Sequence, residues 1–319
     1  MKKTILINDG ISKVGKKQLI DLQFNVIDKH IEQSALIDFI NENNVTGVLV
    51  RSATQIRKDI IDNCPSIKLI GRGGVGMDNI DVEYAQKKNI HVINTPSASS
   101  ASVAELVFSH LFSMARDTYH SNRTMPLEGD LNFKKLKKQY SRGTELRGKK
   151  IGIIGFGKIG QEVAKIALGI GMEVLFYDPT IQKQIINVDF YNNQTITFQL
   201  EKSDFSTLLQ NCDAITIHIP KQKKAVITKT ELKQMKKGSF IINTSRGGII
   251  NEADLISQLQ NGHIRSAALD VYENEPTPKL EILMNEQISL SPHIGAATLE
   301  AQDRIGIELA EQINTLLNG

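Results

Sequence analysis

Cysteine is scarce in this chain, since Cys64 and Cys212 are the only two and they show no CxxC spacing. This usage argues against a disulfide-stapled secreted fold and favours a reducing compartment, with both thiols as small core residues. No apolar run approaches membrane-spanning length, and the apolar run in MKKTILIND is too short for a signal peptide. We therefore expect a cytoplasmic protein with no membrane partner, and the sequence predicts no metal site.

An excess of charge of one sign is also missing. The formal net charge of +3 is the difference between 38 basic and 35 acidic side chains, so no nucleic-acid partner is expected. The densest basic cluster comprises Lys134, Lys135, Lys137 and Lys138. We interpret this cluster as a solvated helix face, and a guard for an anionic substrate is the alternative.

Short apolar segments alternate with helical patterns almost throughout the 319 residues, which is typical of wound α/β folds with parallel sheets. Proline disfavours helix in the residue before it, so we place the joints between domains at Pro96 and Pro292. The closing helix lies beyond the second joint and is expected to return to the first domain. We predict a flavodoxin-like substrate domain of residues 1–96 and 293–319, an inserted Rossmann domain of residues 97–292, and a cleft between them.

Two further segments stand out from the regular alternation. Residues 181–200 contain Asn192-Asn193 between two β-prone runs, which indicates a surface hairpin; a functional arm is the alternative. A long helical segment is predicted from about residue 101 to residue 122, with one face able to pack on a sheet. The residues at helical spacing on this segment are Val103, Leu106, Val107, His110, Leu111 and Met114.

The most informative stretch is IGIIGFGKIGQEVAKIALGIGMEVLFYD, residues 151–178. It has the pattern of a strand, a glycine-rich turn, a helix and a second strand, the unit that binds a dinucleotide. Gly155 permits a tight turn, Gly157 lets the backbone approach a pyrophosphate, and Gly160 lets helix and strand pack closely. Free N–H groups at the start of the helix attract the anion.

Asp178 closes this unit and indicates which dinucleotide is bound. It follows Gly160 at close to the spacing of about 20 residues expected for an acid that accepts hydrogen bonds from ribose hydroxyls. A carboxylate repels a 2′-phosphate, and the nearest cation is Lys183, so we predict NAD rather than NADP. A second glycine-rich turn, residues 71–76, has Asn94 at the matching distance and lacks the acid. We interpret it as a turn whose backbone N–H groups face the cleft.

Three polar residues follow successive strands of the predicted dinucleotide domain, namely Arg246, Glu275 and His293. Loops at the carboxyl ends of parallel strands are where wound α/β folds build their sites. Hydride exchange between nicotinamide and a hydroxy-bearing carbon also moves one proton and requires the substrate carboxylate to be held. Histidine suits the first task and arginine the second, and a nearby carboxylate stabilises imidazolium. Taken singly, each residue is more typical of an exposed loop, and their succession favours a site.

The sequence closely resembles the D-isomer-specific 2-hydroxyacid dehydrogenases, most of all those that act on D-3-phosphoglycerate. The resemblance implies NAD-dependent oxidation of D-3-phosphoglycerate to 3-phosphohydroxypyruvate, in serine biosynthesis. The alternatives are a glyoxylate/hydroxypyruvate reductase, another D-2-hydroxyacid dehydrogenase, or an NAD(H)-sensing binding protein. The matching segments appear in family order and are VRSAT (50–54), IGRGGVGMDNID (70–81), NTP (94–96), SVAEL (102–106), GTELRGKKIGIIGFGKIG (143–160), NTSRGGIINEADL (243–255), AALDVYENEP (267–276) and SPHIGAAT (291–298).

The resemblance assigns roles to individual residues. It implies that Arg246 binds the substrate carboxylate and carbonyl, that His293 is the acid/base, and that Glu275 is its partner. Asp270 matches a contact to the nicotinamide carboxamide. The cofactor-binding residues from motif and resemblance together are Gly155, Gly157, Lys158, Ile159, Gly160, Asp178, Ile219, Thr244, Ser245, Asp270 and Val75. The substrate-binding residues are Arg246, Gly74, Val75 and Gly76, with Arg51 and Ser52 on the phosphate side.

The resemblance also implies an assembly, and the sequence departs from the family in two ways. It implies a homodimer, in which another face of the helical segment 101–122 meets a second subunit; core packing alone is the alternative. Ser99 stands where the phosphoglycerate enzymes often have Asn. The sequence ends one helix after His293, so we expect no appended regulatory domain and no serine feedback through one.

Overall fold

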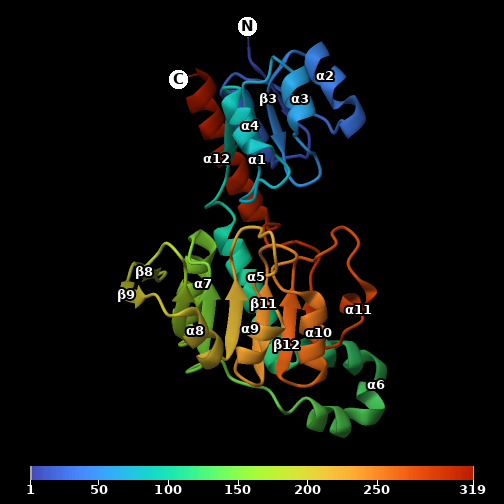
Figure 1. The fold of residues 1–319 in the computed structure, drawn as a ribbon, viewed down its shortest axis with the longest axis vertical. Coiled ribbons are helices and arrows are strands. Elements are labelled where there is room, and N and C mark those ends of the chain that lie inside the picture. Colours follow the sequence, from blue (N-terminus) through green and yellow to red (C-terminus); the bar gives the residue numbers. More distant parts are fainter. Residues whose placement is uncertain (1, 319) are drawn as a thin grey trace. The chain divides into compact units, whose positions relative to one another are not determined.

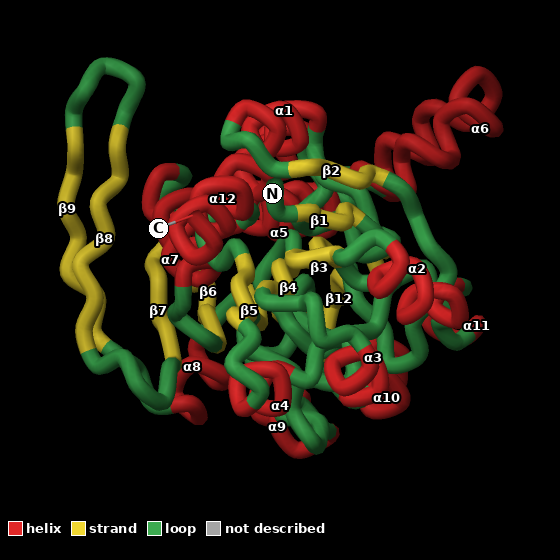
Figure 2. Tube along the Cα trace, turned by 90° about the horizontal axis from the view of Figure 1, so that it is seen from above, coloured by secondary structure: helices red, strands yellow, loops and turns green. Residues whose placement is uncertain are grey.

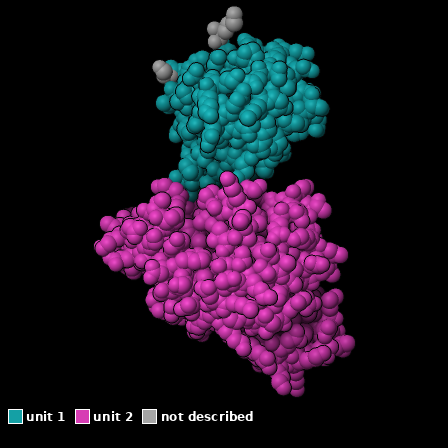
Figure 3. Space-filling view, in the orientation of Figure 1, with its two compact units in different colours: residues 1–102, 296–319 teal, residues 103–295 magenta. Residues whose placement is uncertain are grey.

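The computed structural model describes residues 2–318 (Figure 1). The chain divides into two compact units, residues 1–102 with 296–319 and residues 103–295 (Figure 3). The first joint lies inside a continuous helix rather than at Pro96, since α5 (Ser100–Arg116) runs across it. The second lies after Gly295 rather than at Pro292, because Asp270 binds the amides of Ile294 and Gly295. His293 therefore belongs to the larger unit and not to the predicted substrate domain.

The smaller unit is built on a parallel sheet of five strands in the order β2-β1-β3-β4-β5. Both faces are covered, which is why the central strands are almost wholly buried and apolar. The strands are β1 (Thr4–Ile7), β2 (Asn25–Asp28), β3 (Val45–Val50), β4 (Leu69–Arg72) and β5 (His91–Asn94). The helices are α1 (Lys13–Asp21), the 3-10 turn η1 (Gln33–Ala35), α2 (Leu36–Glu42), α3 (Lys58–Asn63), α4 (Val82–Lys87) and α12 (Leu299–Asn318).

The closing helix α12 returns to this smaller unit, as predicted. It packs beside α1 so closely that a Cβ on Gly15 would lie 2.4 Å from the Cα of Gly306. Its apolar face joins α1 on one side of the sheet, while α2, α3 and α4 cover the other side. The strand order reverses between β1 and β3, so the loops after these two strands form the point where such sheets bind ligands.

The larger unit is built on a parallel sheet of six strands in the order β13-β12-β11-β10-β6-β7. Together the two parallel sheets confirm the predicted α/β fold. The strands are β6 (Lys150–Ile154), β7 (Glu173–Tyr177), β10 (Ala214–Ile217), β11 (Ser239–Asn243), β12 (Ile264–Leu269) and β13 (Ile288–Leu290). The helices are α5, α6 (Thr118–Gln139), α7 (Lys158–Gly169), α8 (Phe205–Asn211), α9 (Lys229–Gln234), α10 (Glu252–Gln260) and α11 (Leu280–Leu283). The chain turns to opposite sides of β6, so the switch point lies at the end of β6.

The predicted surface hairpin is confirmed as β8 (Lys183–Asp189) paired antiparallel with β9 (Thr195–Glu201). Figure 2 shows it extending beside β7. It is anchored rather than free, because Ile186 and Val188 on one face are buried against the core of the larger unit. Its other face carries exposed side chains, among them Ile185.

The helical segment predicted for residues 101–122 is instead two helices. Asp117 adopts a left-handed backbone conformation (φ 57°) between α5 and α6 and separates them. The apolar positions predicted on α5 lie mainly in the core, while Phe112 on the same helix is exposed. Further exposed apolar side chains lie on α6, at Leu127, Leu131 and Phe133. Within residues 2–318 no helix combines the length and the apolarity that crossing a membrane requires.

Candidate active site

The glycine-rich turn after β6 has the geometry that a dinucleotide requires. Gly155 has φ of +89°, and a Cβ there would lie 2.4 Å from the carbonyl oxygen of His218. A Cβ on Gly160 would lie 2.3 Å from the carbonyl oxygen of Gly155, so this glycine permits α7 to approach the turn. Around Gly157, by contrast, no atom lies within 4 Å of the Cβ position. Gly157 caps α7 without a side-chain bond, so the first N–H groups, from Lys158 onward, can bind a pyrophosphate.

Asp178 is held at the end of β7 by four donors. Its Oδ2 accepts the N–H of Phe156 at 2.9 Å, while Oδ1 accepts from the amide and hydroxyl of Thr180, both at 2.8 Å, and from the amide of Ile181. Burial raises the pKa of this carboxyl, but these hydrogen bonds outweigh it and the net pKa is lowered. Asp178 is therefore ionised, and Oδ2 retains acceptor capacity for ribose hydroxyls.

Phe156 links this acid to the interior of the unit. Its ring stacks on that of Phe176, with 3.9 Å between the ring centroids, and both rings are fully buried. The backbone of the turn thus gains its position from the core on one side and from Asp178 on the other. Together, the open space at Gly157 and the anchored carboxylate of Asp178 fit a nicotinamide dinucleotide.

His293 and Glu275 form a direct pair in the same unit. Nδ1 of His293 lies 2.8 Å from Oε2 of Glu275, and Oε1 of Glu275 accepts the N–H of Tyr272 at 2.9 Å. Burial raises the pKa of Glu275, but hydrogen bonds from His293 and Tyr272 and the charge of Arg246 lower it, and the net direction is downward. Glu275 is therefore an anion beside the ring, which is the arrangement that supports an imidazolium.

Arg246 lies on the loop that follows β11, and that loop is fixed in two ways. Asn243 accepts from the amide and hydroxyl of Ser245 and donates from Nδ2 to the carbonyl oxygen of Arg246. A Cβ on Gly247 would lie only 1.7 Å from the carbonyl oxygen of Tyr272. Only glycine allows this approach, which brings the Arg246 loop against the loop that carries Glu275.

Asp270 holds the segment on which His293 is carried. Its buried Oδ1 accepts from the hydroxyl of Ser291 at 2.6 Å and from the amide of Ile294 at 2.8 Å, and Oδ2 accepts from the amide of Gly295 at 2.9 Å. Between these contacts His293 itself is left-handed, with φ of 56°. The resemblance assigned Asp270 to the nicotinamide carboxamide. The structure adds a role in shaping the His293 loop that no motif predicted.

The other predicted cofactor residues also lie in the larger unit, except Val75, which lies in the smaller one. Thr244 and Ser245 directly follow β11, and both are buried. Ile219 lies two residues after β10, and its Cγ2 would lie 2.8 Å from a Cβ on Gly155. These residues therefore line the carboxyl edge of the sheet beside the glycine-rich turn.

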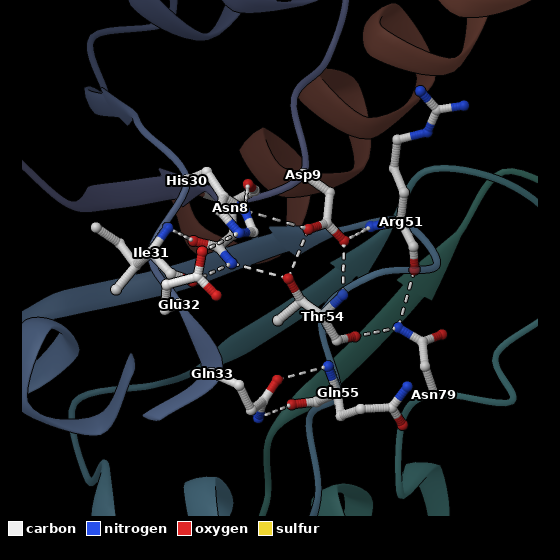
Figure 4. Close-up of polar contacts among 10 residues, drawn as sticks. All are labelled: Asn8, Asp9, His30, Ile31, Glu32, Gln33, Arg51, Thr54, Gln55 and Asn79. Atoms are coloured by element: carbon white, nitrogen blue, oxygen red, sulfur yellow. Dashed lines mark hydrogen bonds and ion pairs between the residues drawn. The ribbon is translucent and has the colours of Figure 1, made fainter. Parts of the chain in front are cut away.

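In the smaller unit, Arg51 and Ser52 follow β3, at the reversal point of that sheet. The N–H of Arg51 donates to Asp9 Oδ2 at 2.6 Å, and its carbonyl oxygen accepts from Nδ2 of Asn79 at 2.9 Å (Figure 4). Asp9 also accepts from the amide and hydroxyl of Thr54, at 3.1 and 2.5 Å. The backbone of Arg51 is thus fixed, while Figure 4 shows its guanidinium directed away from this network. No ion pair to the guanidinium is found within residues 2–318.

The second glycine-rich turn follows β4 in the same unit. Gly74 has φ of +138°, and the Arg72 guanidinium lies where a Cβ on Gly74 would stand, with 2.1 Å between that position and Nη1. The carbonyl oxygen of Val75 accepts from Nδ2 of Asn94 at 2.7 Å, which fixes the turn before Gly76. Sequence reasoning missed Asp9 and Asn79 as supports of Arg51. Their positions after β1 and within the MDNID segment were the available signal.

Comparisons with known proteins agree with this geometry. A statistical family model described as "D-isomer specific 2-hydroxyacid dehydrogenase, NAD binding domain" matches residues 108–295. The chain is 38% identical over 313 residues to a hydroxypyruvate reductase of Thermotoga maritima, with 96% of each chain covered. It is 37% identical over 317 residues to a D-3-phosphoglycerate dehydrogenase of Methanocaldococcus jannaschii, with 99% of this chain and 57% of the relative covered. The chain thus spans little more than half the length of that relative.

The fold is similar to that of solved structures over its whole length. An NAD+-bound 3-phosphoglycerate dehydrogenase of Entamoeba histolytica aligns with a TM-score of 0.78 and 27% sequence identity, covering 100% of this chain and 96% of that one. The similarity therefore extends through both compact units.

Proposed function

The chain belongs to the D-isomer-specific 2-hydroxyacid dehydrogenases, and on this premise we propose that it oxidises D-3-phosphoglycerate to 3-phosphohydroxypyruvate in serine biosynthesis. Family membership makes it an NAD-dependent D-2-hydroxyacid dehydrogenase, with residues 108–295 as the NAD-binding domain. The phosphorylated substrate is the finer part of the proposal. It is supported by the phosphoglycerate dehydrogenase relatives and by the arginine at the reversal point of the smaller sheet.

In the proposed mechanism, His293 exchanges the substrate proton through Nε2. Bound NAD supplies the hydride acceptor. Ionised Glu275 can only accept a hydrogen bond, so the Nδ1 of His293 carries a proton and donates it at 2.8 Å. In the neutral ring the lone pair then lies on Nε2, which takes the hydroxyl proton as the hydride leaves the same carbon. In the reverse direction the imidazolium returns this proton to the ketone oxygen.

We assign the substrate carboxylate to Arg246. A guanidinium offers parallel donors that match a carboxylate, and this one lies near enough to Glu275 to lower the pKa of that carboxyl. The substrate carboxylate would be a second anion beside Arg246, in addition to Glu275. Its binding and the retention of the proton on His293 are therefore coupled through the charges of Arg246 and Glu275. The backbone N–H groups around Val75 and Gly76 are the proposed second contact to the carboxylate.

Arg51 is the observation that carries the phosphorylated substrate. A distal phosphate requires a cation that a simple 2-hydroxyacid does not need. Arg51 has a backbone fixed by Asp9 and Asn79, and no ion pair occupies its guanidinium in the part of the chain that the structure describes. A cation with a fixed backbone and no ion pair among the described residues is suited to a ligand phosphate.

The test compares Arg51→Ala with Arg57→Ala, a matched control whose guanidinium is already bound by Asp81. Arg51→Ala is expected to lower kcat/KM for phosphohydroxypyruvate reduction at least tenfold, about 1.4 kcal/mol. Reduction of glyoxylate and hydroxypyruvate is expected to stay the same, because neither has a phosphate. Arg57→Ala is expected to leave both activities unchanged.

The outcomes separate the proposal from its rivals. Equal losses on phosphorylated and unphosphorylated substrates, or a wild-type preference for hydroxypyruvate, would favour a hydroxypyruvate reductase, the activity named for the Thermotoga maritima relative. NADH binding without turnover of any 2-ketoacid would favour an NAD(H)-sensing protein.

We further propose a homodimer that uses α6. Leu127 and Leu131 are 79% and 85% exposed, and Phe133 adds a third exposed apolar side chain on the same helix. Such a group of large apolar side chains is typical of a protein interface. The basic cluster at the end of α6 lies exposed beside them, in agreement with the interpretation as a solvated helix face.

A further inference from the structure

A buried histidine on α5 contacts both serines at the end of β13. His110 is 6% exposed, with Nδ1 2.8 Å from Oγ of Ser289 and Nε2 3.0 Å from Oγ of Ser291. Its neighbours Val107 and Leu111 on the helix belong to the apolar core. A polar ring in such surroundings is tolerated only when both nitrogens have partners.

The direction of each hydrogen bond follows from Asp270, the carboxylate at which this series of hydrogen bonds ends. Asp270 accepts from Ser291 Oγ at 2.6 Å, so the single hydroxyl proton of Ser291 points toward Asp270. Ser291 Oγ must then accept from Nε2–H of His110. In the neutral ring Nδ1 is left as an acceptor for the hydroxyl of Ser289. Burial lowers the pKa of His110 and the charge of Asp270 opposes this only in part, which agrees with a neutral ring.

The same carboxylate shapes the turn that carries the proposed acid/base. Asp270 also binds the amides of Ile294 and Gly295, on the carboxyl-terminal side of His293. His293 has φ of 56°, a conformation that a residue with a side chain adopts only when its surroundings impose it. The ordered path from His110 through Ser291 and Asp270 therefore ends on the two amides that follow His293.

We propose that His110 is a positioning residue for His293, acting through Ser291 and Asp270. The inference rests on the proposed role of His293 and adds a residue that touches neither substrate nor cofactor. Nε2–H of His110 keeps the Ser291 hydroxyl directed at Asp270. Without it, Ser291 Oγ lacks its donor and the Asp270 carboxylate holds the turn less firmly.

The test uses two replacements of His110, of which only one restores a donor near the position of Nε2. His110→Leu removes both contacts, whereas His110→Gln places an amide N–H near the position of Nε2. His110→Leu is expected to lower kcat for ketoacid reduction about fivefold, the size of one neutral hydrogen bond, with KM for NADH unchanged. His110→Gln is expected to recover most of this loss. Equal losses in both variants, or unchanged kcat in His110→Leu, would overturn the inference.

Ser291→Ala provides a second route if His110→Leu does not fold, since it removes only a hydroxyl. It is expected to lower kcat as His110→Leu does, and the double variant is expected to be no worse than either single one. Additive losses would show that the two residues act separately and would contradict the proposed path.

Hydrogen–deuterium exchange separates this inference from the proposed function. The amides of Ile294 and Gly295 are expected to exchange faster in His110→Leu than in His110→Gln or the wild type, whether or not any ketoacid is reduced. If the wild-type protein reduced no ketoacid, the proposed function would be wrong, and the exchange measurement would still test this inference. Equal exchange in all three proteins would defeat the inference.

Discussion

Glu275 offers the sharpest test of the acid/base pair, because its two oxygens serve two donors. Oε1 accepts the N–H of Tyr272 and Oε2 accepts Nδ1–H of His293. A glutamine of the same shape has one acceptor, and its other end is a donor. In Glu275→Gln, either the Tyr272 bond is lost or a donor faces Nδ1 of His293. The negative charge beside the ring disappears in both cases.

The magnitude follows from the separation and the exposure of the pair. Two unit charges about 4 Å apart interact by about 4 kcal/mol at an effective dielectric of 20 and by about 1 kcal/mol in water. The side chains of His293 and Glu275 are 45% and 35% exposed, so solvent screening places the pair nearer the lower value. The pKa of Glu275 is already lowered, so its charge is present throughout the neutral range. Removing that charge is expected to move the alkaline limb of ketoacid reduction down by about one pH unit, ~1.4 kcal/mol.

The assay is the pH profile of kcat/KM for ketoacid reduction, followed by NADH absorbance. Its alkaline limb reports loss of the proton that the reduction consumes. Glu273→Gln is the matched control, because Glu273 binds Lys279 and the amide of Glu252 and makes no contact with His293. An alkaline limb in Glu275→Gln that overlays the wild type, or an equal shift in Glu273→Gln, would refute the reasoning.

Three further predictions concern the cofactor and the assembly. Asp178→Ala is expected to raise KM for NAD by the worth of a charged hydrogen bond, about 1.5–3 kcal/mol, and to relax discrimination against NADP; unchanged NAD/NADP selectivity in steady-state kinetics would contradict this. Gly157→Ala is expected to keep the wild-type Tm, because its Cβ meets no protein atom, but to weaken NADH binding in fluorescence titration. Gly160→Ala is instead expected to lower Tm, because its Cβ clashes with the turn. The wild type is expected to sediment as a dimer and Leu127→Asp/Leu131→Asp as a monomer of about 35.4 kDa; a monomeric wild type at micromolar concentration would exclude the dimer.

The dinucleotide half of the site could be predicted from sequence because its requirements are local. Gly155, Gly157 and Gly160 lie within one turn and the start of one helix, and each answers a need of the backbone at its own position. The alternation of strands and helices was also predictable, since parallel strands covered on both faces are short, continuous apolar runs. The break at Asp117 was not, because the left-handed conformation of a single residue has no strong signature in the sequence.

The supports of the site were beyond sequence reasoning, since they join distant parts of the chain. Asp9 and Asn79 hold the backbone of Arg51 from the loops after β1 and β4, which meet only once the sheet has formed. The fold that brings such loops together is set by strand order, and a spacing along the chain does not report it.

His110 shows most clearly what the sequence determines and what only the tertiary structure determines. Its place in a run of apolar residues at helical spacing determined that it would lie in a helix and face inward, and the sequence alone was sufficient for that. Whether an inward histidine is a packing residue or part of a polar path depends on what the facing strand presents. Ser289 lies on that strand and Ser291 directly after it, roughly 180 positions further along the chain. Only the tertiary structure decided this role, because a hydrogen bond requires two groups within about 3 Å and periodicity describes just one of them.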